Sequence, residues 1–313
     1  FEMYVILGSW IDCKGAWTDQ RDHSVGAIEN NTLEIEKAVR LANQYPHIVK
    51  VIAVGNEAMV HWQEAYYVKP DVILKWVNNL QGLKKKGELP TDLWITSSDN
   101  FASWGGGDDS YHLDALTQLI KAVDYLSIHT YPFHDTHYNE DFWLNRSVSN
   151  LSKEDNIEAA MVRAVAYAIG QYNAVKNHLA TLGVDKPIHI GESGWSTASE
   201  GFYGDNGSHA ADEYKQALYY QKIQEWSKQN NITTVYFSAF DEQWKDPNGP
   251  LASENNFGLF TIDGKAKYAL WPLVDKGVFK SLSREENGPQ ISKTFEGDLQ
   301  KVLVKSKAPK TKA

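Results

Sequence analysis

Short runs of apolar residues alternate along the chain with longer amphipathic stretches. The short runs are rich in Val, Ile and Leu, as is typical of parallel strands that are covered on both faces. The longer stretches have apolar positions at helical spacing. Strands are predicted at Met3–Trp10, Val49–Gly55, Leu93–Ser97, Tyr125–His129, Ile188–Gly191 and Thr233–Ala239. Helices are predicted at Thr32–Asn43, Val72–Lys86, Asp114–Val123, Asn156–Leu182 and Ala210–Gln229. This order indicates successive βα units.

Polar or charged residues follow most of the predicted strands. They are Asn56-Glu57, Ser98-Asp99-Asn100, His129–Tyr131, Glu192 and Asp241-Glu242. A closed α/β barrel has eight strands. Their carboxyl ends meet on one face of the barrel, and active sites are built there. Only six strands are predicted here, and Phe1 stands two residues before the first of them. We therefore expect a (β/α)8 TIM barrel whose strands one and two come from outside this sequence, so no signal peptide can be sought.

Three long connections follow strands and are rich in Gly, Asp, Asn, Ser and aromatic residues. They are Asn100–Tyr111, Pro132–Lys153 and Ser196–His209. Loops of this length are usually functional walls or lids. From Ser281 onward the chain becomes polar and Lys-rich. We predict a catalytic barrel domain at residues 1–280 and a C-terminal extension at 281–313, loosely packed and frayed at its tip.

The composition excludes several classes of protein. A chain of 313 residues that is 42% apolar can bury a core in one large domain. Its net charge of −9 disfavours nucleic acid and anionic membranes as partners. No apolar stretch approaches the length of a membrane span, and the single Cys13 excludes an internal disulfide framework. The eleven Trp and sixteen Tyr are explained either by stacking on sugar rings or by core packing.

Two glutamates each come directly after an apolar strand, Glu57 after Val51–Asn56 and Glu192 after Ile188–Gly191. Glycoside hydrolysis needs two carboxyl groups, about 5–5.5 Å apart when the anomeric configuration is retained. A glycine shortly before each glutamate would let substrate or backbone approach closely. Acidic residues at strand ends can also be present only for solubility. The glycine before each glutamate weighs against that alternative here.

Four motifs resemble those of glycoside hydrolase family 17, the β-1,3-glucanase family of retaining (β/α)8 barrels. They are Val-Gly-Asn-Glu at 54–57, Gly-Glu-Ser-Gly-Trp at 191–195, Phe-Asp-Glu-Gln-Trp-Lys at 240–245 and Glu-Asn-Asn-Phe-Gly-Leu-Phe at 254–260. The resemblance runs from Phe1 to about Leu273. It implies that Glu57, after strand four, is the acid/base and Glu192, after strand seven, is the nucleophile. Ser196 stands where plant members have Pro, so the chain looks more like the bacterial branch.

The resemblance and the strand-end pattern together imply a set of substrate-binding residues. By resemblance, Glu242, Lys245 and Glu254 line the cleft. Asn56 can donate to a sugar 2-hydroxyl, and Tyr131 can hydrogen-bond either the nucleophile or a hydroxyl. Tryptophans near strand ends can stack on glucose or pack in the barrel mouth. The complete predicted set is Asn56, Trp10, Asp99, Asn100, Tyr131, Trp195, Glu242, Lys245 and Glu254.

The predicted activity is retaining endo-hydrolysis of a laminarin-type β-1,3-glucan, with no cofactor and no metal. Two alternatives stay open: a β-1,3-glucanosyltransferase that uses the same residues, and a non-catalytic glucan-binding protein. The partner is expected to be β-1,3-glucan polysaccharide or oligosaccharide, and the protein is expected to be a monomer. The family and its polymeric substrate imply a secreted protein at an extracellular, periplasmic or cell-surface location.

Overall fold

The computed structural model describes residues 3–144, 151–247 and 249–311. Its main sheet has six strands in the order β1-β4-β5-β6-β7-β8. The pairs β1–β4, β4–β5 and β5–β6 are parallel. These strands are β1 (Val5–Ser9), β4 (Val49–Asn56), β5 (Trp94–Asn100), β6 (Leu126–His129), β7 (Ile188–Ser193) and β8 (Thr234–Tyr236). All six strands predicted from apolar runs are present.

Eight α-helices alternate with these strands in the described residues. They are α1 (Ile28–Gln44), α2 (Pro70–Lys85), α3 (Asp114–Ala122), α4 (Pro132–Tyr138), α5 (Lys153–Thr181), α6 (Glu213–Gln229), α7 (Trp271–Asp275) and α8 (Leu299–Lys305). The five predicted helices correspond to α1, α2, α3, α5 and α6. Helix α6 starts at Glu213 rather than Ala210 because Asp212 caps it, accepting a hydrogen bond from the Lys215 N–H.

The chain forms two compact units. The first comprises Phe1–Thr130 and Gly170–Gly191, and the second comprises Tyr131–Ile169 and Glu192–Ala313. The chain passes from one to the other between Thr130 and Tyr131, within α5 and within β7.

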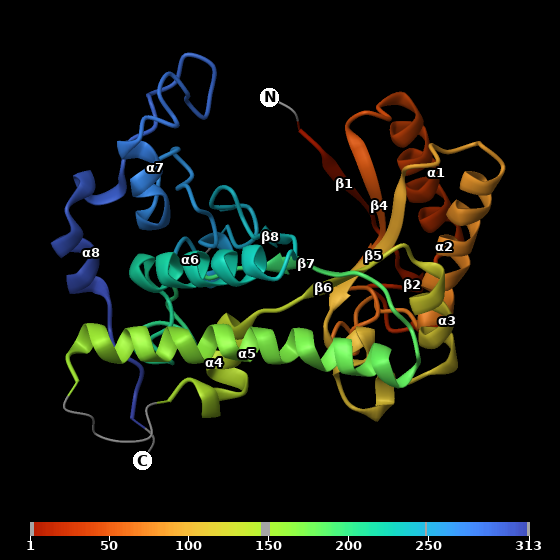
Figure 1. Cartoon of the computed structure of the whole chain (residues 1–313), viewed down its shortest axis with the longest axis horizontal. Coiled ribbons are helices and arrows are strands. Elements are labelled where there is room, and N and C mark those ends of the chain that lie inside the picture. Colours follow the sequence, from red (N-terminus) through yellow and green to blue (C-terminus); the bar gives the residue numbers. More distant parts are fainter. Residues whose placement is uncertain (1–2, 145–150, 248, 312–313) are drawn as a thin grey trace. The chain divides into compact units, whose positions relative to one another are not determined.

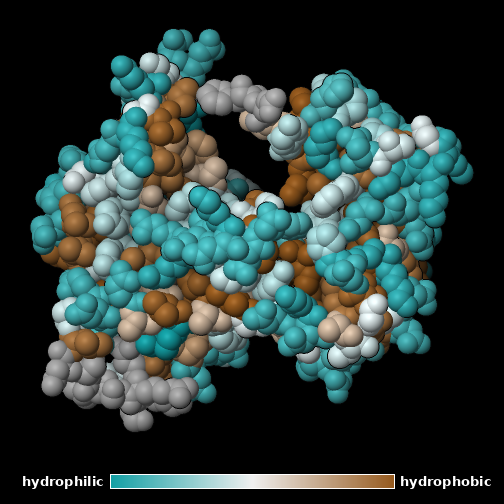
Figure 2. Space-filling view, in the orientation of Figure 1, coloured by the Kyte–Doolittle hydropathy of each residue, from teal (hydrophilic) through white to brown (hydrophobic). Residues whose placement is uncertain are grey.

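In the first unit, α1, α2 and α3 lie along one side of strands β1, β4 and β5 (Figure 1). The strand residues Ile52, Ile95 and Ile128 are fully buried. The outer surface of the helices is mainly hydrophilic (Figure 2). Strand β1 is the edge of the sheet, and hydrophobic atoms gather over it in Figure 2. Ser9 of β1 pairs with Val54 of β4, after a register shift between Val5 and Ile6. Because the strands are parallel, their carboxyl ends lie at one edge of the sheet, and so do the residues that follow them.

A small antiparallel hairpin, β2 (Cys13–Lys14) with β3 (Asp22–Gly26), follows β1. The sequence analysis missed it because strand β2 is only two residues long and shows no alternation of apolar and polar positions. Backbone hydrogen bonds join the hairpin to the loop after β4: Cys13 N–H donates to Tyr66 O at 3.1 Å, and Lys69 N–H donates to His23 O at 2.8 Å. The two loops therefore form one layer above the strand ends.

The second unit is built around large aromatic side chains. Phe133, Trp143, Trp195, Tyr219 and Phe257 are all almost fully buried. The connection predicted at Pro132–Lys153 contains α4, which starts with Pro132 in the first turn, where proline is favoured. The sequence analysis treated this segment as irregular because seven residues give too little helical periodicity. Part of that connection, residues 145–150, lies outside the described residues.

The residues of the predicted C-terminal extension belong to the second unit and are anchored in it by a few contacts, although most of them are exposed. The separate extension at 281–313 stays a prediction. Val302 of α8 is buried, Thr294 Oγ1 donates to Glu213 Oε2 at 2.8 Å, and Lys153 Nζ donates to Leu303 O at 2.7 Å. Its Lys-rich composition conceals these few anchoring contacts. The predicted fraying of the tip concerns residues 312–313, outside the described part of the chain. Within the described part, every helix is too short or too polar to cross a bilayer.

Candidate active site

The backbone turns sharply where β4 delivers Glu57. Gly55 has φ +82°, and a Cβ there would come within 2.9 Å of the Ala58 Cβ. Glu57 itself has φ +46°, a left-handed conformation that costs energy in a residue with a side chain. Its N–H donates to Ser98 O at 3.0 Å. The turn is thus held by β5, and it aims the Glu57 side chain from the strand end.

A chain of polar groups holds the Glu57 carboxyl. His129 Nδ1 lies 3.0 Å from Glu57 Oε1, and His129 Nε2 lies 2.8 Å from Ser98 Oγ. Ser98 Oγ is in turn 2.9 Å from Ser127 Oγ. His129 is fully buried, so it cannot swing away from the carboxyl. In the sequence, the only signal for His129 is its place at the end of the apolar strand β6, which leaves its role open.

Asp99, predicted to contact sugar, is buried beneath this group. Its Oδ2 accepts the Met59 N–H at 2.7 Å, and its Oδ1 accepts the Asn100 N–H at 2.8 Å. Burial, with the nearby Glu57 carboxyl adding to it, raises the pKa of Asp99 to about 7. The predicted sugar contact is wrong, because a side chain with no exposed surface cannot reach a ligand. Asp99 instead fixes the loop that follows Glu57.

The neighbouring amides Asn56 and Asn100 are partly exposed at the same strand ends. Asn56 pairs with Ser98 in the sheet. The Asn100 side-chain oxygen accepts the Ala102 N–H at 3.0 Å. Asn56 thus lies directly before the Glu57 turn, and its donation to a sugar hydroxyl stays a prediction.

Strand β7 brings Glu192 to its end through Gly191. A Cβ on Gly191 would overlap Ser127 Oγ and come within 2.7 Å of Ser98 Oγ, so no other residue fits. In the second unit, the Tyr131 hydroxyl donates to Glu192 Oε2 at 2.8 Å. Of the two partners predicted for Tyr131, the structure shows the glutamate. This bond orients the Glu192 carboxyl, and the donated O–H favours its ionised form.

Lys245 and Glu242 form an ion pair in the loop after β8. Lys245 Nζ lies 3.4 Å from Glu242 Oε2 and 4.1 Å from the centre of the Phe237 ring. Both side chains are about three-quarters buried, so the ammonium group is held between a carboxylate and an aromatic face. The structure brings Lys245 and Glu242 together, and their role in lining the cleft stays a prediction.

Glu254 is half exposed and lies 3.8 Å from His134 Nε2. His134 Nδ1 is 3.1 Å from the Tyr203 hydroxyl, which fixes the ring. Sequence analysis missed His134, since nothing in α4 singles it out. The loop of Glu242 is anchored by a buried pair in which Lys267 Nζ donates to Asp241 Oδ1 at 2.7 Å.

The two predicted tryptophan contacts differ in their exposure. Trp10 is 40% exposed, and its Nε1–H donates to Asp12 Oδ1 at 2.6 Å. Trp195 has no exposed surface, and its Nε1–H donates to Ala210 O at 2.8 Å. Stacking on sugar therefore stays a prediction for Trp10 and is wrong for Trp195, which packs in the core of the second unit.

Comparison with protein families decides which family these motifs belong to. The BtgE/BtgC glycoside hydrolase domain matches residues 2–258. The chain belongs to this glycoside hydrolase family. The resemblance to glycoside hydrolase family 17 inferred from the four motifs is thereby confirmed.

Two solved structures resemble this family member. An endo-laminarinase from Formosa Hel1_33_131 is 57% identical, with a TM-score of 0.97 over 100% of this chain and 79% of its own. A Rhizomucor miehei β-1,3-glucanosyltransferase is 21% identical, with a TM-score of 0.57 over 85% of this chain and 75% of its own; that likeness shows the fold alone. Together they confirm the predicted fold class, a (β/α)8 barrel.

A curated relative agrees with this assignment. The glucan 1,3-beta-glucosidase of Arthroderma benhamiae is 24% identical over 274 residues, which is 84% of this chain and 70% of that protein. The chain is therefore a glycoside hydrolase, and its strand-end glutamates are the candidate catalytic pair.

Proposed function

We propose that this chain hydrolyses β-1,3-glucan internally, as a laminarinase that retains the anomeric configuration. The observation that carries the proposal is the 57% identity, over the full chain, to a protein described as an endo-laminarinase. The chemistry it needs is available: two strand-end glutamates, each with a carboxyl oriented by a hydrogen-bonding partner. Laminarin-type polysaccharide or oligosaccharide is the proposed substrate.

The mechanism is a double displacement. Glu57 donates its proton to the glycosidic oxygen while Glu192 attacks the anomeric carbon, so the leaving glucan departs neutral and a glucosyl–Glu192 ester forms. Glu57, now ionised, then removes a proton from water, which attacks the same carbon from the side that the leaving group vacated. This chemistry requires the two carboxyl groups to be about 5–5.5 Å apart.

The neighbouring groups supply orientation and charge. His129 keeps the Glu57 carboxyl in one rotamer, and Tyr131 does the same for Glu192. Lys245 and Glu242 provide a charged wall, and Glu254 and Trp10 offer further contacts for sugar hydroxyls and ring faces. Asn56 is the proposed donor to the sugar 2-hydroxyl.

The activity is tested by incubating laminarin with purified protein and resolving the products by chain length. Early appearance of oligosaccharides of many lengths supports endo-hydrolysis, whereas release of glucose alone contradicts it. Products longer than the donor chain would identify the glucanosyltransferase alternative. Glu192→Gln serves as the control, because without a nucleophile neither reaction can proceed.

We further propose that the protein acts outside the cytoplasm, in the extracellular space, the periplasm or at the cell surface, as a monomer. A polysaccharide does not cross a membrane, so the enzyme must be where its substrate is. Cell fractionation with activity assays tests the location, and sedimentation equilibrium tests the monomer. Activity confined to the cytoplasm, or a dimer at micromolar concentration, would contradict these proposals.

A further inference from the structure

Three aromatic rings of the first unit pack against one another in a row, each tilted on the next. The ring centres of Trp10 and Tyr66 are 5.0 Å apart, and those of Tyr66 and Trp17 are 5.2 Å apart. Tyr66 is almost fully buried between two tryptophans that both reach solvent. Trp10 follows β1, whose last residue, Ser9, pairs with Val54 of β4, three residues before Glu57. The row therefore starts at the edge of the sheet that carries the proposed acid/base and continues onto the β2–β3 hairpin.

The exposure of Trp17 is built into the hairpin. Its side chain is 65% exposed, although its backbone is tightly held: its N–H donates to Ala65 O at 2.8 Å. Its φ of +65° is a left-handed conformation, which is rare for a large side chain. The Thr18 N–H and the Thr18 hydroxyl both bond Gly15 O and close the turn. A bulky apolar ring is thus held largely in water, with the buried Tyr66 ring as its packing partner.

The surroundings of Trp17 fit a neutral sugar chain. All five residues that follow it, Thr18, Asp19, Gln20, Arg21 and Asp22, are exposed. They place hydrogen-bond donors and acceptors, and charges of both signs, directly after Trp17 in the chain. A glucose ring offers an apolar face to an indole and hydroxyl groups to such polar side chains, and tryptophan suits a surface that is apolar in the centre and wet at the edge.

We infer that Trp17 and Trp10, both packed on the buried Tyr66, form a glucan-binding platform that holds glucose units beyond those at the cleavage point. The inference rests on the proposed glucanase function and adds a second contact for long chains. A substrate long enough to reach the hairpin binds both at the strand ends and on Trp17. A short substrate engages only the strand ends, so the platform makes the enzyme prefer polymer over small oligosaccharides.

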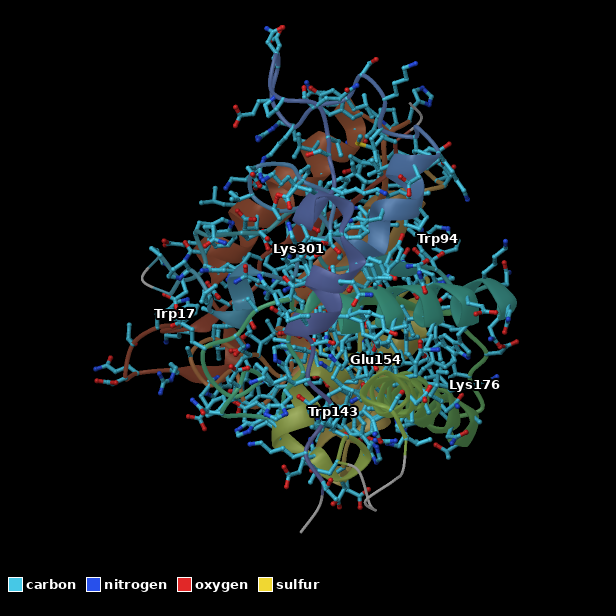
Figure 3. All side chains as sticks on the ribbon, turned by 90° about the vertical axis from the view of Figure 1, so that its left-hand side faces the viewer. Trp17, Trp94, Trp143, Glu154, Lys176 and Lys301 are labelled. Atoms are coloured by element: carbon cyan, nitrogen blue, oxygen red, sulfur yellow. The ribbon has the colours of Figure 1, made fainter. Side chains whose placement is uncertain are left out.

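The first unit offers a matched control in Trp94. This tryptophan is 44% exposed and lies 5.4 Å from the Tyr125 ring, so it is also an exposed indole packed on a tyrosine. Trp94 is the first residue of β5, whereas Trp17 lies in the turn between β2 and β3. Figure 3 shows Trp17 and Trp94 at opposite sides of the view.

The test compares Trp17→Ala, Trp17→Phe and Trp94→Ala with the unchanged protein, on laminarin and on an aryl β-laminaribioside. For Trp17→Ala, the ratio of kcat/KM on laminarin to that on the bioside should fall about three- to tenfold, the usual worth of one aromatic stacking contact. Trp17→Phe should recover part of the loss, and Trp94→Ala should leave the ratio as it was. An unchanged ratio for Trp17→Ala overturns the platform.

Two further measurements keep the outcome decisive. If Trp17→Ala lowers the folded fraction, Trp17→Gly replaces it, because glycine adopts positive φ without strain. If sedimentation shows a dimer that Trp17→Ala dissolves, the exposed ring serves a second copy of the chain and the platform is wrong. If the unchanged protein cleaves neither substrate, the proposed function itself is wrong. If the unchanged protein is active but Trp17→Ala leaves the ratio as it was, only the platform is wrong.

Discussion

The Tyr131 hydroxyl donates a 2.8 Å hydrogen bond to Oε2 of Glu192. The two residues come from consecutive strand ends: Tyr131 follows β6, and Glu192 lies in β7. The Tyr131 ring is itself packed edge-on against Phe257, with ring centres 6.0 Å apart. The nucleophile proposed here is therefore oriented by a phenol whose own position is fixed.

Replacing Tyr131 with Phe should lower kcat by about 10- to 100-fold, since a hydrogen bond to a charged group contributes about 1.5–3 kcal/mol. The melting temperature should change little, because the ring and its packing remain. The measurement is steady-state kinetics on an aryl β-laminaribioside, with Tyr138→Phe, an exposed tyrosine of α4, as the control. Equal kcat in both variants would show that the bond does not serve the reaction.

Trp195 and Trp10 should respond to alanine in opposite ways. Trp195→Ala should reduce stability by about 3–5 kcal/mol, because a fully buried aromatic side chain leaves a cavity. Trp10→Ala should weaken laminarin binding while leaving stability within about 1 kcal/mol. Urea denaturation and affinity electrophoresis separate the two effects. A stable Trp195→Ala protein with poor glucan affinity would restore the sugar-stacking interpretation for that residue.

The contribution of Asp99 to the free energy of unfolding should fall as the pH rises. Its pKa is raised to about 7, so the folded protein holds this proton more tightly than the unfolded chain. The resulting stabilisation is complete below about pH 4 and is lost as the pH rises through about 7, a change on the order of 4 kcal/mol. In Asp99→Asn this residue carries no charge at any pH.

The measurement is the free energy of unfolding of both proteins between pH 4 and pH 8. The other carboxyl groups titrate in both, so the difference between the two curves isolates Asp99. As the pH rises, the free energy of unfolding of Asp99→Asn should increase relative to that of the unchanged protein. Parallel curves would mean that Asp99 is ionised throughout, held by its backbone donors.

Local periodicity was enough to predict much of this molecule. The six strands follow from apolar runs, and the two candidate catalytic glutamates follow from motifs at strand ends. The hairpin, α4 and the packing of the C-terminal extension escaped prediction, because they depend on a few tertiary contacts such as Cys13 N–H to Tyr66 O rather than on a repeating pattern.

Within the candidate site, burial was the property that sequence could not supply. Asp99 and Trp195 stand at or just after strand ends, as exposed ligands would, yet neither side chain has exposed surface. His129 could not be assigned either, since its role depends on the 3.0 Å approach to Glu57, 72 residues away.

Glu57→Gln should cut laminarin turnover by about 10²–10⁴-fold, the usual contribution of general acid–base catalysis. An activated aryl glucoside needs little protonation and should still form the glucosyl-enzyme. Added azide should then accelerate turnover by attacking the intermediate, and the product should be a β-glucosyl azide. No response to azide, with laminarin turnover undiminished, would remove Glu57 from the acid/base role.

The central claim is that Glu192 becomes covalently bound to the sugar. The most direct measurement is mass spectrometry of peptides after the protein reacts with a 2-deoxy-2-fluoro-laminaribiosyl fluoride, which forms the intermediate and slows its hydrolysis. The account predicts a single adduct, on the peptide that contains Glu192. An adduct on another carboxylate, or an enzyme that turns over natural substrate but never carries the label, would contradict it.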